Sequence, residues 1–146
     1  MTQILFNQSS EQMILNHLKR VSPLFKPMLS SYVDLPIYAK KIFEKANRIE
    51  AWNNGCLIGL IAYYLNIEES FAFITNVSLE KEFVGRGIAT QMMEMLYIKT
   101  AGKIKVIKLE VKAINSSAIN FYNKLGFKAI GKGYDFIEME KQLNRN

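Results

Sequence analysis

Apolar side chains in the first third of the chain recur at the spacing of a helix. Two segments, Glu11–Val21 and Ile37–Ala46, are therefore predicted to be helices. Their apolar positions are Met13, Ile14, Leu18 and Val21 in the first segment and Ile37, Ile42, Phe43 and Ala46 in the second. The prolines between the two segments rule out one continuous helix, so we expect an irregular loop, containing Tyr32 and Asp34, that shapes a pocket.

From about Arg48 the period of the pattern shortens to two, which indicates strands. Ile49–Asn53 and Cys56–Leu65 flank Asn54-Gly55, a pair that is typical of hairpin turns, and Phe71–Leu79 alternates along its whole length. We therefore expect three antiparallel strands in succession.

The rest of the chain alternates between helix and strand patterns. The predicted elements are a helix over Gly87–Thr100, a strand over Ile104–Val111, a helix from the cap Asn115-Ser116-Ser117 to Gly126, and a strand over Tyr134–Leu143. A helix between two strands predicts a right-handed crossover into a parallel pair. The whole order indicates the α+β class, an α/β mixed sheet that is mostly antiparallel and has helices on both faces.

Length and composition describe an ordinary globular domain. The chain has 146 residues, which favours a single domain over residues 1–146, and 49% of them are apolar and 22% charged. The longest apolar run, Cys56–Leu65, is about half as long as a membrane span requires, and the first residues lack the order of a secretory signal. We expect a cytoplasmic protein with no membrane partner.

The chain has few side chains of the kinds that bind metals or act as nucleophiles. One histidine and one cysteine, His17 and Cys56, leave little from which to build a metal site or a nucleophile pair, so we expect no metal. The net charge of +6 favours anionic partners in general. Nucleic-acid binding rests on that charge alone, without an RNP-like or helix-turn-helix pattern, and is not expected.

The most informative local feature is the segment Val84-Gly85-Arg86-Gly87-Ile88-Ala89, between a strand and a helix. The start of a helix leaves about four backbone N–H groups without partners, and glycines let the backbone approach a ligand closely. Arg86 adds a cation at the same mouth. The segment therefore suits a diphosphate, although it matches neither the P-loop nor the dinucleotide fingerprint, and a simple glycine-rich turn is the alternative.

A second group consists of Asn115, Tyr122 and Leu125-Gly126-Phe127. Asn115 at a helix start is by itself most often a structural cap. Tyr122 follows about two turns later on nearly the same side of the helix, where an isolated tyrosine is usually a core residue.

Together these segments resemble the GCN5-related N-acetyltransferase (GNAT) superfamily. The resemblance is close from about Asn76 to Gly131 and extends loosely to the whole chain through the order of elements. It implies the acyl-CoA N-acyltransferase fold and acetyl-CoA as co-substrate. One position departs from the family, whose phosphate loop usually opens with Arg or Gln, where this chain has Val84.

The resemblance also implies roles for particular residues. The pantetheine arm of acetyl-CoA would pair with the backbone of Val77 and Leu79, between two splayed parallel strands. The diphosphate would bind the segment from Val84 to Thr90, through Val84, Gly85, Arg86, Gly87, Ile88, Ala89 and Thr90. Asn115 would contact the coenzyme from the opposite wall.

Acyl transfer to an amine needs a neutral amine, a stabilised oxyanion and a proton for the leaving thiolate. A tyrosine is protonated at neutral pH, so Tyr122 is the expected acid, and the Leu79 N–H is expected to polarise the thioester carbonyl. Glu110 is the favoured base, because the segment from Glu110 to Tyr122 resembles that of ribosomal-protein alanine N-acetyltransferases. Glu69 and Glu80 are the alternative bases, and Glu110 as a plain surface charge is also open.

The leading hypothesis is an N-acetyltransferase acting on a primary amine of a small molecule. The alternatives are acetylation of a protein or peptide N-terminus and an acyl-CoA sensor without turnover. The acceptor, the length of the acyl donor and the formation of a homodimer stay open.

Overall fold

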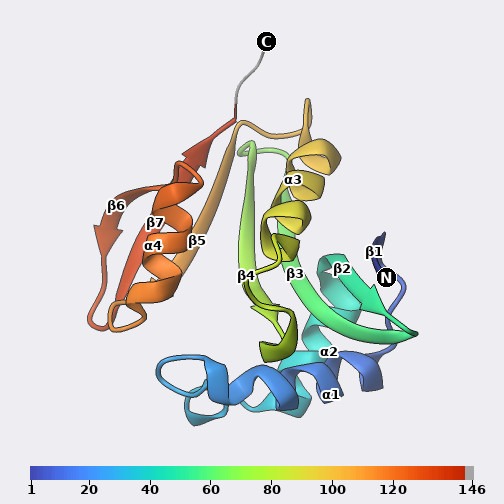
Figure 1. Ribbon diagram of the computed structural model, residues 1–146. Coiled ribbons are helices and arrows are strands. Elements are labelled where there is room, and N and C mark those ends of the chain that lie inside the picture. Colours follow the sequence, from blue (N-terminus) through green and yellow to red (C-terminus); the bar gives the residue numbers. More distant parts are fainter. Residues whose placement is uncertain (144–146) are drawn as a thin grey trace.

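The computed structural model describes residues 1–143. A seven-stranded sheet with the order β1-β2-β3-β4-β5-β7-β6 forms its centre (Figure 1). The strands are β1 (Thr2–Phe6), β2 (Asn47–Asn53), β3 (Cys56–Asn66), β4 (Phe71–Leu79), β5 (Val106–Lys112), β6 (Lys128–Lys132) and β7 (Phe136–Gln142). All neighbouring pairs are antiparallel except β4 and β5, which are parallel. The predicted mixed, mostly antiparallel sheet is confirmed.

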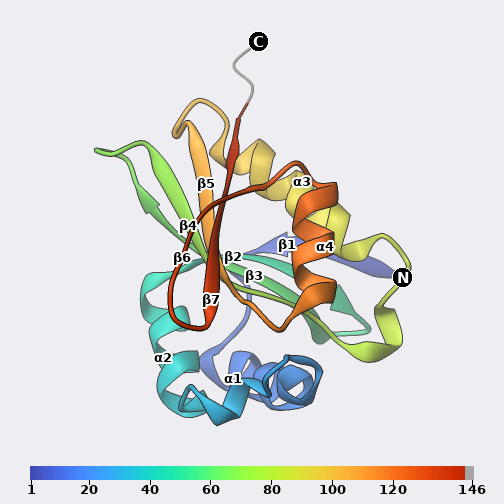
Figure 2. The same cartoon turned by 90° about the vertical axis from the view of Figure 1, so that its left-hand side faces the viewer.

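Helices cover both faces of the sheet, as predicted (Figure 2). The four helices are α1 (Glu11–Val21), α2 (Leu35–Lys45), α3 (Ile88–Thr100) and α4 (Ser116–Lys124). Three short 3-10 turns, η1 (Ser22–Leu24), η2 (Leu29–Ser31) and η3 (Lys81–Phe83), lie in the connections. Within residues 1–143, no helix has the length and apolar character needed to cross a membrane.

Local sequence explains where the helices begin. The side chains of Ser10, Asp34 and Asn115 accept hydrogen bonds from backbone N–H groups in the first turns of α1, α2 and α4. Asp34, which we expected in a pocket-forming loop, therefore serves as a helix cap. Helix α3 begins differently, after Gly87 in a left-handed conformation and without a side-chain cap.

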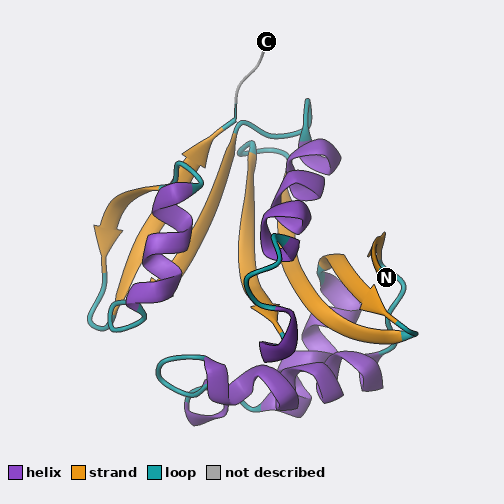
Figure 3. Cartoon of the chain, viewed as in Figure 1, coloured by secondary structure: helices purple, strands orange, loops and turns teal. Residues whose placement is uncertain are grey.

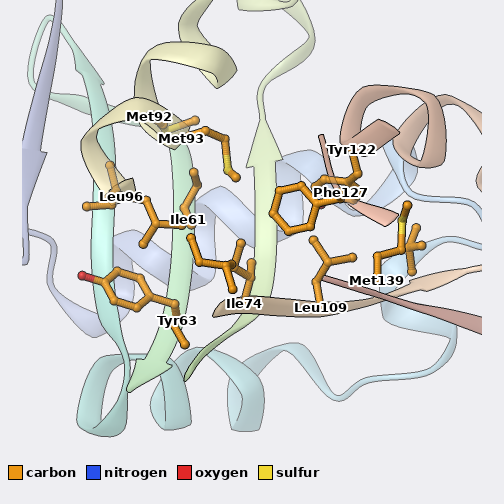
Figure 4. Packing of buried hydrophobic residues seen from close by; sticks show 14 of the residues in the cluster. Ile61, Tyr63, Ile74, Met92, Met93, Leu96, Leu109, Tyr122, Phe127 and Met139 are labelled. Carbon is orange, nitrogen blue, oxygen red and sulfur yellow. The ribbon is translucent and has the colours of Figure 1, made fainter. Parts of the chain in front are cut away.

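Two hydrophobic clusters hold the layers together. The larger packs α3 and α4 on one face of the sheet and includes Met92, Leu96 and Tyr122 (Figure 4). The smaller packs α1 and α2 on the other face, with Ile14 and Ile42 fully buried. The core thus straddles the sheet and fixes both helix layers against it.

Two strands differ from the sequence expectation. The first third is not purely helical, because β1 pairs with β2 at one edge of the sheet. At the other edge, the predicted strand Tyr134–Leu143 is β7, and it forms a hairpin with β6, a separate strand whose residues are all exposed. Both missed strands are five residues long and lie at the edges of the sheet, so each offers only a short pattern to recognise.

Candidate active site

The two parallel strands at the centre of the sheet separate along their length. Phe71–Ile74 of β4 pairs with Val106–Leu109 of β5, and beyond these residues the strands diverge (Figure 1). The divergence coincides with a β-bulge, since Ile74 pairs with Tyr63 and Asn76 pairs with Ala62, which leaves Thr75 without a partner on β3. An opening therefore starts at the bulge.

The backbone of β4 beyond the bulge faces this opening. Glu80 donates its N–H to the Ile58 carbonyl of β3 at 2.9 Å. Because successive backbone amides of a strand point to opposite sides, the amides of Val77 and Leu79 point away from β3 and toward β5. These are the two residues expected to pair with the pantetheine arm.

The loop before α3 also offers free backbone donors. Gly85 and Gly87 have φ angles of +87° and +79°, a conformation that favours glycine. The first helical bond runs from the Gln91 N–H to the Gly87 carbonyl at 3.0 Å. The N–H groups from Gly85 to Thr90 have no acceptor within residues 1–143, so the helix start is available to an anion.

Two cavities meet between the diverging strands. The larger, of about 800 Å³, lies against the α3 loop, and the smaller, of about 350 Å³, lies toward α2 and β5. The residues that line both are Phe25, Val77, Asn115, Ala118 and Tyr122. The two cavities therefore lie against each other and share a wall that includes Tyr122.

Tyr122 is held in place by aromatic packing. Its ring lies 5.4 Å from that of Phe121 and 5.6 Å from that of Phe127, centroid to centroid, at the edge of the larger core (Figure 4). Burial raises the pKa of its hydroxyl above the usual value, and Tyr38 contributes in the same direction. The hydroxyl therefore stays protonated at neutral pH.

Residues 14–127 match the model of the acetyltransferase (GNAT) family. The chain belongs to the GNAT family. Its sheet and helices are those of the acyl-CoA N-acyltransferase fold, as the resemblance implied.

The chain is also similar to known proteins in sequence and in fold. An uncharacterized N-acetyltransferase of Methanocaldococcus jannaschii is 34% identical over 99 residues, which is 62% of this chain and 42% of that relative. The ribosomal-protein-S18-alanine N-acetyltransferase of Escherichia coli is similar in structure, with a TM-score of 0.79 at 17% identity over 98% of this chain and 94% of the other. The PaiA N-acetyltransferase of Thermoplasma acidophilum, solved with coenzyme A, has a TM-score of 0.75 at 18% identity over 96% and 99%.

The other residues expected at the GNAT coenzyme site differ in position. Val84, Gly85, Gly87, Ile88, Ala89 and Thr90 line the larger cavity. Arg86 does not, because its guanidinium lies over the ring of Phe83, 5.3 Å from the centroid. Asn115 caps α4, which confirms the structural interpretation; it also lines the two cavities, and its contact with the coenzyme stays a prediction.

The three candidate carboxylates are far from equivalent. Glu110 is exposed and lines the smaller cavity. Glu80 lines neither cavity and is bound by His17 and Arg20; burial alone would raise its pKa, but these two partners outweigh burial and lower it. Glu69 is exposed in the turn between β3 and β4, at the end of β4 remote from the opening. Neither Glu80 nor Glu69 lines a cavity, so neither is placed to act as the base.

Val77 is a second candidate for the role expected of Leu79. Leu79 lines only the larger cavity, whereas Val77, two residues closer to the bulge, lines both, as Tyr122 does.

The wall of the smaller cavity was largely missed from sequence. The connection between α1 and α2 runs below the opening and contributes Phe25, Leu29 and Tyr32 (Figure 3). Tyr32 had been expected in a pocket, and the Lys112 ammonium lies 4.4 Å from its ring centroid. Tyr38, Phe73 and Phe136 complete an aromatic lining that no short motif announces.

Proposed function

We propose that this chain transfers the acetyl group of acetyl-CoA to a primary amine of a small molecule, by direct attack in a ternary complex. The observation that carries the proposal is the meeting of two cavities at Tyr122 and Val77, where a donor and an acceptor would come into contact. Holding two reactants in contact supplies much of the rate of such a transfer.

The chain's residues fit the coenzyme. Six consecutive N–H groups, from Gly85 to Thr90, would bind the diphosphate, and Lys81 lines the same cavity with a positive charge. A Cβ atom at Gly85 or Gly87 would meet no protein atom within 4 Å, so open space lies in front of the loop. Because the amides carry the site, Val84 in place of Arg or Gln is expected to weaken binding modestly.

Three groups would carry the chemistry on the thioester that acetyl-CoA supplies. The Val77 N–H polarises the thioester carbonyl, and Glu110 takes a proton from the acceptor amine, directly or through a water. The new C–N bond forms as the C–S bond breaks, and Tyr122 donates its proton to the departing sulfur. Tyr122 suits this step because its hydroxyl is protonated and the residue lines both cavities.

The acceptor is proposed to be a small amine because the smaller cavity has room for little more. It holds about 350 Å³ and is lined mostly by apolar and aromatic side chains, with Glu110 as its one lining carboxylate among residues 1–143. A polycationic acceptor would require more negative charge than this wall offers.

A peptide N-terminus is the second candidate. The resemblance of the segment from Glu110 to Tyr122 to ribosomal-protein alanine N-acetyltransferases favours it, and one relative in fold acts on an alanine of ribosomal protein S18. In that case, the smaller cavity would take the first side chain of the peptide.

An acceptor panel assayed for CoA release tests the proposal. Small monoamines are expected to release CoA faster than polyamines, aminoglycosides or short peptides. Release with peptides alone would favour the second candidate. Acetyl-CoA binding by calorimetry without release for any acceptor would indicate a sensor, and absent binding would refute all three.

A further inference from the structure

A chain of buried hydrogen bonds connects the smaller cavity to helix α1. Asn76, only 3% exposed, lines the cavity just after the bulge, and its Oδ1 lies 2.8 Å from the Ser78 Oγ. The same Oγ lies 2.8 Å from the His17 Nε2. The His17 Nδ1 is 3.1 Å from the Glu80 carboxylate, which also accepts from the Arg20 Nε at 2.9 Å.

The protonation state of His17 determines which end of the Asn76 carboxamide, Oδ1 or Nδ2, faces the cavity. The Glu80 carboxylate can only accept, so the His17 Nδ1 must donate to it. In a neutral ring the Nε2 then has no proton and accepts from the Ser78 hydroxyl. Ser78 has no second hydrogen, so it must accept from Asn76, whose Nδ2 therefore faces Ser78 and whose Oδ1 faces the cavity.

A protonated ring would reverse the two bonds between His17, Ser78 and Asn76, while Glu80 would still accept from the His17 Nδ1. The His17 Nε2 would donate to Ser78, Ser78 would donate to the Asn76 Oδ1, and the Nδ2 group would face the cavity. In that orientation the buried Nδ2 makes no well-formed hydrogen bond within residues 1–143; the Tyr38 hydroxyl lies near the carboxamide but donates to the Thr75 carbonyl at 2.6 Å. A half-turn of the carboxamide exchanges the two arrangements without changing its shape.

The surroundings of His17 favour the neutral ring. Burial lowers its pKa, more than the Glu80 carboxylate raises it. Arg20, the other charged side chain facing the ring, already balances Glu80 and opposes a further positive charge, and the Leu57 backbone is a smaller influence toward protonation. A protonated ring would place an unbalanced charge in the core, which is costly.

We propose that the Asn76 carboxamide oxygen accepts a hydrogen bond from the N–H of the acceptor amine. Ser78 and His17 are positioning residues that hold this oxygen toward the cavity. The inference rests on the proposed function and adds a specificity-determining residue to it. Asn76 directly precedes Val77, so an amine bound to its oxygen lies next to the junction where the thioester is expected.

The single histidine of the chain gives a direct test of the orientation. Nitrogen-15 NMR of the full chain, labelled at histidine and recorded near pH 7.5, reports the protonation of each ring nitrogen. A neutral ring with its proton on Nδ1 is expected. A neutral ring protonated on Nε2, or an imidazolium ring, as the main form would overturn the inference. This measurement needs neither turnover nor a variant.

Two substitutions test contact with the amine. Asn76→Leu, which keeps the size of the side chain without its oxygen, is expected to raise the KM for the amine roughly tenfold or more while leaving the KM for acetyl-CoA unchanged. Asn76→Asp also keeps an oxygen toward the cavity; its other oxygen can only accept, so Ser78 donates to it and the His17 ring takes up a proton to donate to Ser78. This variant is expected to retain the amine KM within a few-fold. A role limited to structure would not produce this difference between the two substrates.

The outcomes separate this inference from the proposed function. If wild-type protein acetylates amines and Asn76→Leu has an unchanged amine KM, or Asn76→Asp is as impaired as Asn76→Leu, the inference alone is overturned. If wild-type protein acetylates no amine, the proposed function fails first, and the role of Asn76 fails with it. Should Asn76→Leu not fold, Asn76→Asp and the NMR measurement still decide.

Discussion

Tyr122 is buried at the junction of the two cavities, and its environment makes it a proton donor rather than a base. Burial and the neighbouring Tyr38 raise the pKa of its hydroxyl, so the phenol is protonated throughout the neutral range. We predict that Tyr122→Phe lowers kcat roughly hundredfold, the scale of one general acid, and leaves the Kd for acetyl-CoA unchanged. Steady-state kinetics and calorimetry measure the two quantities. Tyr97→Phe, a change on α3 away from both cavities, is the control, and equal kcat values in the two variants would remove Tyr122 as the acid.

Glu110 can be tested against Glu138, the carboxylate opposite it on the neighbouring strand. Glu138 pairs with Glu110 across β5 and β7 but lines neither cavity. We predict that Glu110→Gln lowers kcat/KM for an amine roughly tenfold or more near neutral pH, because the substrate ammonium then lacks a base. Raising the pH should recover part of the loss as the amine deprotonates in solution. Glu138→Gln should retain kcat/KM, and a similar loss in both variants would indicate a surface charge effect.

The loop between β4 and α3 is expected to bind the diphosphate through its backbone amides, so its function depends on the conformation of the whole loop and not on one side chain. Gly87→Val forces a β-branched side chain into a left-handed conformation and onto the cavity wall. We predict a rise of roughly tenfold or more in the Kd for acetyl-CoA, measured by calorimetry. Gly102→Val imposes nearly the same strain at the other end of α3, with φ of +78°, and is the control. If both variants bind acetyl-CoA with full affinity, the diphosphate assignment is wrong.

Elements with strong patterns were predictable from the sequence, and those shaped by their neighbours were not. Helix α1 and strand β4 match their predicted bounds. The bulge at Thr75 was not predictable, because no turn or glycine interrupts the strand sequence there and only the pairing with β3 shows it. The strand beyond the bulge contributes to both sides of the site, since Ser78 is hydrogen-bonded to His17 of α1 while Val77 and Leu79 line the larger cavity.

Some parts of the candidate site could be predicted from the sequence and others could not. The phosphate loop and Tyr122 lie in short contiguous motifs, so sequence resemblance pointed to them, and their roles stay predictions. The wall of the smaller cavity is assembled from α2, β4, β5 and the segment after α1, so no local pattern marks it. His17 meets Ser78 across 61 positions of sequence, and its lone occurrence had suggested little chemistry.

At the scale of the whole molecule, His17 and Glu80 join helix α1 to the end of β4, and they make the stability of the fold depend on pH. The pKa of His17 is below its usual 6.5 in the folded chain, so below about pH 6.5 the unfolded chain binds a proton that the folded chain does not. The pKa of Glu80 is also lowered, so its contribution is present above pH 4.5 and is lost as the pH falls further. Both effects weaken the fold on acidification, in successive windows.

We therefore predict that the free energy of unfolding in urea falls as the pH drops from 7 to 5, with a slope of up to about 1.4 kcal/mol per pH unit for one proton, and falls again below pH 4.5. His17→Gln removes the group that titrates in the first window and should flatten that part of the profile, while the lower window persists. Arg20→Gln removes one partner of Glu80 and should reduce the lower window. A slope between pH 7 and 5 that survives His17→Gln would mean that another group controls it, and that the ring does not stay neutral in the fold.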